Sequence, residues 1–269
     1  MRLKAMCDMV LVAEEDCPTV GMLRPSSGLA QWLASESYYF DPPVQSTEYV
    51  DVFGNLCQRF VVPKGRLRIR VDVVVDTEAA IAVEPNAQCT PVDEVPDTVL
   101  QFLLQSRYCP SDKMGDRAAQ IVAGVAPGYA QVEAIRAWIH GNLDYRYGVS
   151  SAATDALDTL ANGAGVCRDF SHVGIALCRA LKIPARMVVG YLYQLDPMDL
   201  HAWFEAFVGG RWYTFDATQD APRGGRIVVA YGRDAADVAF LSNYGPLTTE
   251  RLKVQVDLHV DEVPAPLAD

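Results

Sequence analysis

Long apolar runs, signal-type leaders and an excess of basic residues are all absent from this chain of 269 residues. No apolar run approaches the roughly 18 residues that a membrane-spanning helix needs. Asp8 interrupts the short apolar stretch that follows Met1-Arg2-Leu3-Lys4, which is not the pattern of a secretory signal. With 23 Lys and Arg against 34 Asp and Glu, the chain is also too acidic to favour nucleic acid or anionic lipid. We therefore expect a cytoplasmic protein with no membrane and no nucleic-acid partner.

Four common site motifs are missing as well. The sequence contains no glycine-rich phosphate loop, no dinucleotide-binding loop, no His-Glu-x-x-His and no Gly-x-Ser-x-Gly. Its seven cysteines include no Cys-x-x-Cys pair, so a structural zinc site is not expected. An odd number of cysteines suits a reducing compartment, in which thiols stay free.

The chain divides into two regions with different hydrophobic patterns. Residues 67–75 alternate apolar and polar side chains, which is typical of a strand with one buried face, and Gly54-Asn55 suggests a hairpin turn. Beyond residue 95 the spacing becomes helical, above all over 132–143, and strands follow from residue 186 onward, with the last expected over 252–260. The sequence predicts an all-β domain over 1–95 and an α+β domain over 96–269.

Cys167 is a candidate nucleophile because of its place at the start of a predicted helix. It follows Gly163-Ala164-Gly165 and precedes an apolar helical face. Unpaired N–H groups and the helix dipole favour a thiolate there, and such positions lower a cysteine pKa from about 8.5 to roughly 3.5–7.5. The alternative is a small buried hydrophobic residue, which is the interpretation we prefer for Cys178.

A predicted hairpin supplies a base and a carboxylate. Strands 201–208 and 211–216 flank Gly209-Gly210, a two-residue turn that pairs Val208 with Arg211. In that register Asp216 lies opposite Trp203 and diagonal to His201, unless a bulge intervenes. Asp216 could then hold the imidazole in one tautomer, and with Cys167 the three residues form the parts of a thiol acyl-transfer triad.

These segments also carry a family resemblance. Residues 165–172 (Gly-Val-Cys-Arg-Asp-Phe-Ser-His), 201–205 (His-Ala-Trp-Phe-Glu) and 216–218 (Asp-Ala-Thr) resemble successive signatures of the transglutaminase-like superfamily, whose bacterial branch is often described as candidate cysteine proteases. Residues 23–25 and 51–55 resemble the β domain that precedes the core in that branch. The resemblance implies a papain-like core, with a helical part on an antiparallel sheet, after an N-terminal all-β sandwich.

The resemblance also implies roles for single residues. Cys167 would be the nucleophile, His201 the general base and acid, and Asp216 the orienting carboxylate. The Cys167 N–H would bind the oxyanion, with Tyr145 or Tyr147 as candidate second donors, although core packing explains either tyrosine equally well.

Further residues have supporting roles in this interpretation. We expect Asp169 to cap the helix start or pair with a cation, and Trp203 and Glu205 to support the triad from the strand. His172, on the far side of the helix from Cys167, is expected to be structural. Arg168 and Lys182 depart from the family pattern, which bears on substrate preference.

The leading hypothesis is a cysteine-nucleophile peptidase or amidase that acts on a peptide or protein through an acyl-thioester, with no metal or organic cofactor. Three alternatives remain. A lysine amine could replace water, as in transglutamination, which the sequence does not distinguish from hydrolysis. Acetyl transfer from acetyl-coenzyme A is disfavoured because Arg-Gly-Gly-x-Cys is absent. The last alternative is a catalytically silent protein-binding scaffold. The sequence does not specify an oligomeric state.

Overall fold

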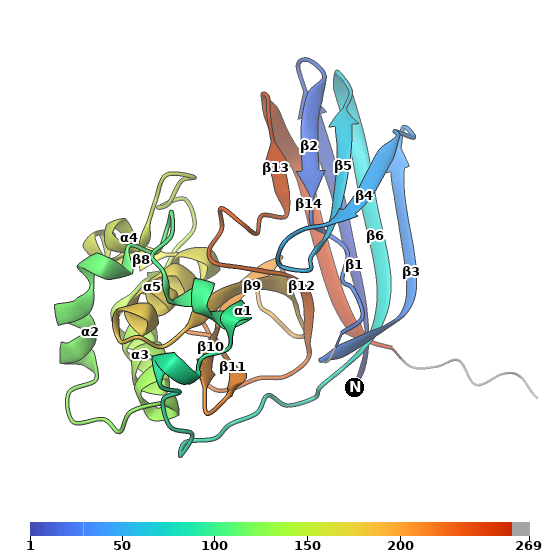
Figure 1. The fold of residues 1–269 in the computed structure, drawn as a ribbon. Helices are drawn as coiled ribbons and strands as arrows, with labels where there is room; N and C mark the ends of the chain where they lie inside the picture. The colour runs from blue at the N-terminus through green and yellow to red at the C-terminus, as the bar shows by residue number, and fades with distance from the viewer. Residues whose placement is uncertain (29, 260–269) are drawn as a thin grey trace, which may run out of the picture.

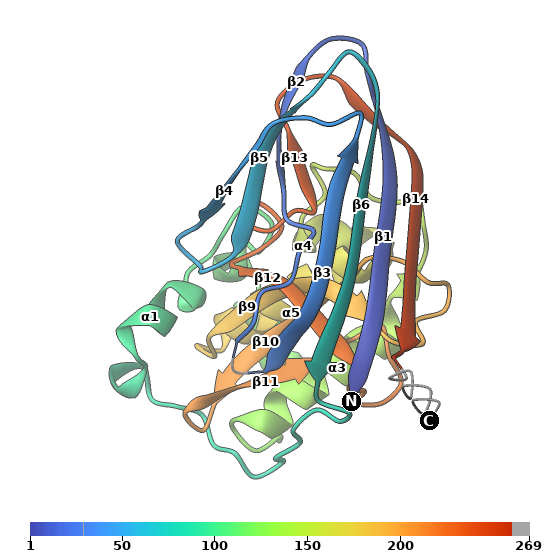
Figure 2. The same ribbon diagram turned by 90° about the vertical axis from the view of Figure 1, so that its right-hand side faces the viewer.

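Two packed antiparallel sheets form the β-rich part of the molecule. The structure, a computed structural model, describes residues 1–28 and 30–259. One sheet has the order β14-β1-β6-β3, from Leu247–Leu258, Arg2–Ala13, Gly65–Thr77 and Gln31–Asp41. The other has the order β13-β2-β5-β4, from Leu241–Asn243, Cys17–Gly21, Leu56–Val62 and Ser46–Val50. Figures 1 and 2 show the two sheets face to face, as the predicted sandwich requires.

The alternating pattern over residues 67–75 forms the centre of this sandwich. Leu67, Ile69, Val71, Val73 and Val75 are all buried, while the residues between them are only half-buried. The hairpin turn predicted at Gly54-Asn55 also forms, because β4 pairs with β5 from Val50 opposite Leu56. Burial of the apolar faces of the central strands drives the two sheets together.

The end of the predicted catalytic region belongs to the sandwich instead. Strand β13 pairs with β2, and β14 pairs with β1 from Leu3 opposite Leu258 to Ala13 opposite Leu247. The expected division into 1–95 and 96–269 therefore needs correction at its C-terminal side, since residues 241–258 complete the N-terminal sheets. Of the strand expected over 252–260, residue 260 lies outside the described residues. Pairing with β14 gives β1 a neighbour on each side.

The α/β part combines five helices with a third antiparallel sheet, beside the sandwich (Figure 1). The helices are α1 (Asp97–Leu100), α2 (Gly115–Ile121), α3 (Tyr129–Asn142), α4 (Ala156–Asn162) and α5 (Cys167–Ala180). The sheet has the order β11-β10-β9-β12, from Arg211–Phe215, His201–Val208, Ala185–Leu192 and Arg226–Gly232. Three 3₁₀ turns (Val92–Glu94, Gln101–Leu103, Ser111–Lys113) and the short strands β7 (Asp144–Tyr145) and β8 (Ala164–Gly165) complete it. No helix among the described residues is both long and apolar enough to cross a membrane.

Helix α5 is the buried centre of this part, and close packing fixes its position. At Gly174 an added Cβ would lie 2.6 Å from Cε1 of Phe204 on β10, so only glycine allows the helix to approach the sheet this closely. Near the other end, buried Arg179 donates hydrogen bonds to the carbonyl oxygens of Leu104, Ala185 and Arg233. The helix is therefore held on the sheet by a close contact and by a buried hydrogen-bond network.

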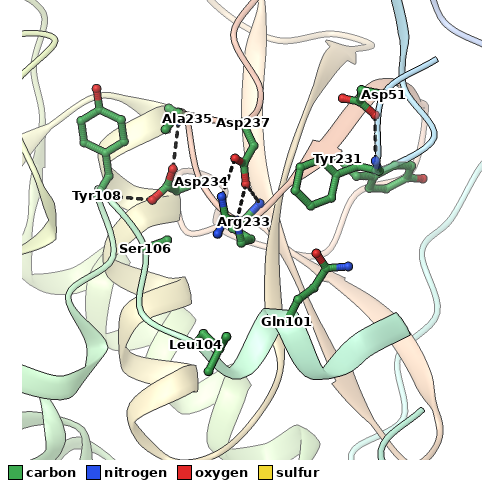
Figure 3. A network of polar contacts seen from close by, with 12 residues as sticks. Asp51, Gln101, Leu104, Ser106, Tyr108, Tyr231, Arg233, Asp234, Ala235 and Asp237 are labelled. Atoms are coloured by element: carbon green, nitrogen blue, oxygen red, sulfur yellow. Dashed lines mark hydrogen bonds and ion pairs between the residues drawn. The ribbon is translucent and has the colours of Figure 1, made fainter. Parts of the chain in front are cut away.

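The segment after β12 makes polar contacts with this same α/β part of the molecule. Figure 3 shows Asp234 accepting a hydrogen bond from the backbone N–H of Tyr108 at 2.7 Å, and Arg233 paired with Asp237 at 2.8 Å. Helix α4 has Asp155 as its N-cap. The Asp155 backbone is extended, and its side chain accepts hydrogen bonds from the N–H groups of Leu157 and Asp158.

Candidate active site

Three element ends bring Cys167, His201 and Asp216 together. Cys167 is the first residue of α5, His201 is the first residue of β10, and Asp216 directly follows β11. The chain enters α5 tightly: Gly163 has a φ of 63°, and an added Cβ on Gly165 would lie 2.6 Å from the Asp169 side chain. Glycine is therefore required at both positions, and it places the Cys167 side chain at the helix start.

The β10–β11 hairpin has the register that the two-glycine turn predicts. Its pairs run from Val208 opposite Arg211 to Phe204 opposite Phe215, with no register shift between them. Nε2 of His201 lies 2.8 Å from Oδ2 of Asp216, and both side chains are almost fully buried. Because the Asp216 carboxylate occupies Nε2, Nδ1 is the ring nitrogen left for a second partner.

Cys167 is the other neighbour of this imidazole, because its side chain and its charge are among the influences on the His201 pKa. The thiol is only partly buried, unlike those of Cys109 and Cys178. Burial lowers the pKa of His201, but the charge and hydrogen bond of Asp216, followed by the contact with Cys167, outweigh it and raise this pKa to about 9. The arrangement therefore favours a protonated imidazole beside a sulfur atom at a helix N-terminus.

The Asp216 carboxylate has further partners that sequence reasoning did not identify. Its Oδ2 also accepts a hydrogen bond from Nη2 of Arg226 at 2.9 Å, and its Oδ1 accepts from the N–H and hydroxyl of Thr218 at 3.0 and 2.7 Å. Burial raises the pKa of Asp216, but His201 and then Arg226 outweigh it, so this pKa is lowered and the carboxylate stays ionised. Thr218 stands two residues after Asp216 and could have been found as an Asx-type turn. Arg226 starts a strand ten residues away, with no local signal.

The two candidate oxyanion tyrosines differ in their relation to Cys167. Tyr145 lies near Cys167, which influences the pKa of its hydroxyl, and parallel pairing of β7 with β8 places Tyr145 opposite Gly165. Burial, followed by the charge of Cys167, raises the pKa of Tyr145, so its hydroxyl keeps its proton. Tyr147 is more exposed and contacts Tyr145, with 5.6 Å between the ring centres. The structure thus brings Tyr145, rather than Tyr147, to the helix start.

The supporting residues have separate structural partners. Asp169 is fully buried; it accepts a hydrogen bond from the Val166 N–H at 2.9 Å and pairs with Arg168 at 2.8 Å, so it has both expected roles. Trp203 lies beside His201, with 6.1 Å between ring centres. Glu205 shares the strand face of His201, but its carboxylate pairs with Arg186 at 2.7 Å. It lines a cavity of about 630 Å³ between this sheet and the sandwich.

His172 has the structural place expected of it. It is fully buried, its Nε2 accepts a hydrogen bond from the Ala235 N–H at 3.2 Å, and its ring stacks on Tyr108 at 5.0 Å. Burial lowers its pKa to about 3. Among residues 1–28 and 30–259, no group of three His, Cys, Asp or Glu side chains is arranged to hold a metal ion, and the cofactor-free chemistry stays a prediction.

Comparisons with known proteins agree with this fold. The family model described as "Transglutaminase-like superfamily" matches residues 115–217, which include Cys167, His201 and Asp216. An uncharacterized protein of Mycobacterium leprae is 30% identical over 234 residues, which cover 81% of this chain and 82% of the relative. One from Mycobacterium tuberculosis is 28% identical over 271 residues, covering 91% and 86%. The crystal structure of a candidate cysteine protease from Cytophaga hutchinsonii is 35% identical, with a TM-score of 0.92 over 98% of this chain and 93% of that one.

Proposed function

We propose that this chain, which belongs to the transglutaminase-like superfamily, is a cysteine-nucleophile hydrolase of amide bonds in peptides or proteins. The observation that carries the proposal is the position of His201, held by Asp216 on one side at 2.8 Å and facing Cys167 at the helix start on the other. A thiol, an imidazole and a carboxylate in this order are the groups that thiol acyl transfer requires.

The reaction would proceed in two halves. The Cys167 thiolate attacks the amide carbonyl, and the oxyanion is stabilised by the Cys167 N–H and the Tyr145 hydroxyl. His201, protonated beside Asp216, gives its proton to the departing amine as the C–N bond breaks. It then removes a proton from water, which attacks the acyl-thioester. The C–S bond breaks, the carboxylic acid leaves, and the Cys167 thiolate and protonated His201 are restored. Asp216 keeps its negative charge throughout and holds the imidazole in one orientation.

The first test is the detection of an acyl adduct. The full chain is incubated with a peptide library, and its intact mass is measured, followed by peptide mapping. We expect an adduct on Cys167 that is absent from Cys167→Ala and retained in Cys89→Ala. Cys89 is a suitable control because it is also a partly buried thiol but lies outside any helix. An adduct that never forms, or that maps to another cysteine, would overturn the proposal.

A second measurement tests the activation of the thiol without any substrate. At neutral pH we expect iodoacetamide to label Cys167 faster than it labels a free model thiol, because imidazolium and helix dipole stabilise the thiolate. Labelling that is no faster would contradict the nucleophile assignment.

Amine transfer is a separate outcome. Both amine transfer and hydrolysis of a glutamine side chain release ammonia, but only amine transfer incorporates one labelled amine for each ammonia released. That result would show that an amine replaces water as the acceptor. Cytoplasmic location stays a prediction.

A further inference from the structure

Arg226 is a buried cation with a specific place beside the candidate triad. Its side chain is 6% exposed, its Nη2 donates to Oδ2 of Asp216 at 2.9 Å, and its Nε donates to the carbonyl of Arg223 at 3.0 Å. The guanidinium lies over the Trp203 ring at 4.8 Å. Thr77 from the sandwich donates a hydrogen bond to the backbone carbonyl of Arg226 at 2.7 Å. Arg226 is therefore held from three sides with its charge directed at Asp216.

One carboxylate oxygen serves two cations at once. Oδ2 of Asp216 accepts from Nε2 of His201 at 2.8 Å and from Nη2 of Arg226 at 2.9 Å, so the two nitrogens are within about 6 Å of each other. Oδ1 is occupied by the two groups of Thr218. All four acceptor positions of the carboxylate are thus used, so rotation of the carboxylate would break hydrogen bonds that it now accepts.

The charges of this buried group balance because of Arg226. Asp216 and Arg226 together are neutral, so the pair of Cys167 and His201 can change between thiol with imidazole and thiolate with imidazolium without adding net charge to the interior. If Arg226 were neutral, the full charge of Asp216 would act on His201 alone. The imidazolium would then bind its proton more tightly and release it less readily to a leaving amine.

We propose that Arg226 is a positioning residue of the triad: it fixes the Asp216 carboxylate and shares its charge with His201, so that the imidazole can both hold and release a proton. The inference deepens the proposed function and rests on it. The sequence contains no local motif around Arg226, and only the fold brings it to Asp216.

Other charged or titratable groups near the pair must stay constant in any test. These groups surround His201 and Asp216 and come from each element packed against them. They are Cys167 (α5), Glu133, Arg136 and His140 (α3), Glu205 (β10), Asp220 (after β11) and Arg223 (before β12). Comparing variants that differ only at Arg226 keeps these groups the same. A Cys167→Ala background removes the thiol, so that the His201 titration is not coupled to it.

The experiment follows the imidazole signals of the full chain by NMR from pH 5 to 11 in the Cys167→Ala background. Only four histidines are present, so His201 can be assigned by its loss in a His201→Gln variant. The variants are Arg226→Gln, which keeps a hydrogen-bond donor but has no charge, and Arg226→Lys, which keeps the charge. Thr218→Val is the matched control, because it removes a hydrogen bond from Asp216 without changing any charge.

We expect Arg226→Gln to raise the midpoint of the His201 titration by about one pH unit, a tenfold change, since a like charge about 6 Å away is lost. Arg226→Lys and Thr218→Val should leave the midpoint within a few tenths of a unit. An unchanged or lower midpoint in folded Arg226→Gln would overturn the proposal. If that variant does not fold, Arg226→Lys decides: a midpoint near the parent value supports charge sharing, and a shift of one unit refutes it.

The same data separate this inference from the function on which it rests. The titration needs no substrate, so a chain that forms no acyl adduct but shows the expected Arg226→Gln shift would refute the hydrolase and retain the charge sharing. A chain that forms the adduct but shows no shift in the Arg226→Gln variant would retain the hydrolase and refute the charge sharing.

Discussion

The raised pKa of His201 predicts that the protein loses stability as the pH becomes alkaline. The folded value is about 9, against an ordinary value of 6.5. Because the folded state binds this proton more tightly than the unfolded chain does, the added stability is fully present below pH 6.5. It is lost as the pH rises through 9. At about 1.36 kcal/mol per pKa unit, the loss amounts to about 3 kcal/mol of unfolding free energy.

The assay is urea unfolding, followed by tryptophan fluorescence, of Cys167→Ala and of the double variant Cys167→Ala/His201→Gln between pH 6 and 10. The Cys167→Ala background removes the thiol that contacts His201. The other free thiols also ionise on unfolding at alkaline pH, but they do so in both proteins and cancel in the difference. We expect the stability difference between the two proteins to shrink by about 3 kcal/mol between pH 6.5 and 9.5. A difference that stays constant across this range would refute the reasoning that Asp216 holds a protonated imidazole in the folded state.

Two further predictions concern helix α5. His172 has a folded pKa of about 3, so the unfolded chain takes up its proton first and stability falls as the pH drops below 6.5. By pH 5 the loss should be about 2 kcal/mol, and urea unfolding should show it in the native sequence but not in His172→Gln. Gly174→Ala places a methyl group 2.6 Å from a Phe204 carbon and should cost about 1–3 kcal/mol of unfolding free energy. Wild-type stability in that variant would show that the contact relaxes at no cost.

Short-range patterns explain why much of the fold could be predicted from the sequence. Strand β6 was visible because residues 67–75 alternate, and burial of one face requires that alternation. The Asp216–His201 contact was visible because Gly209 and Gly210, with φ of 56° and 79°, form a turn that fixes the register of everything beyond it. In both cases the determining residues lie within a dozen positions of the feature that they determine.

Long-range pairing explains what the sequence could not reveal. Strand β14 closes the first sheet by pairing with β1, more than 230 residues earlier, and its own alternation is weak because only Val254 and Val256 are buried. Arg226 is similarly hidden, since an arginine at the start of a strand resembles any solvent-exposed edge residue. Its contact with Asp216 can be predicted only when the positions of both β11 and β12 in the sheet are known.

Strand β12 links the sandwich to the candidate site, which gives the N-terminal region a physical part in the geometry. The Gln31 side chain bonds to the N–H and carbonyl of Val228, and Asn55 bonds to both backbone groups of Tyr231 in the same way. Thr77 holds the carbonyl of Arg226 itself. The sandwich thus forms hydrogen bonds with three residues of β12. One of them, Arg226, is the residue whose guanidinium donates to Asp216. Positioning of the carboxylate therefore depends on both halves of the chain, because neither half alone holds Arg226 at both its backbone and its side chain.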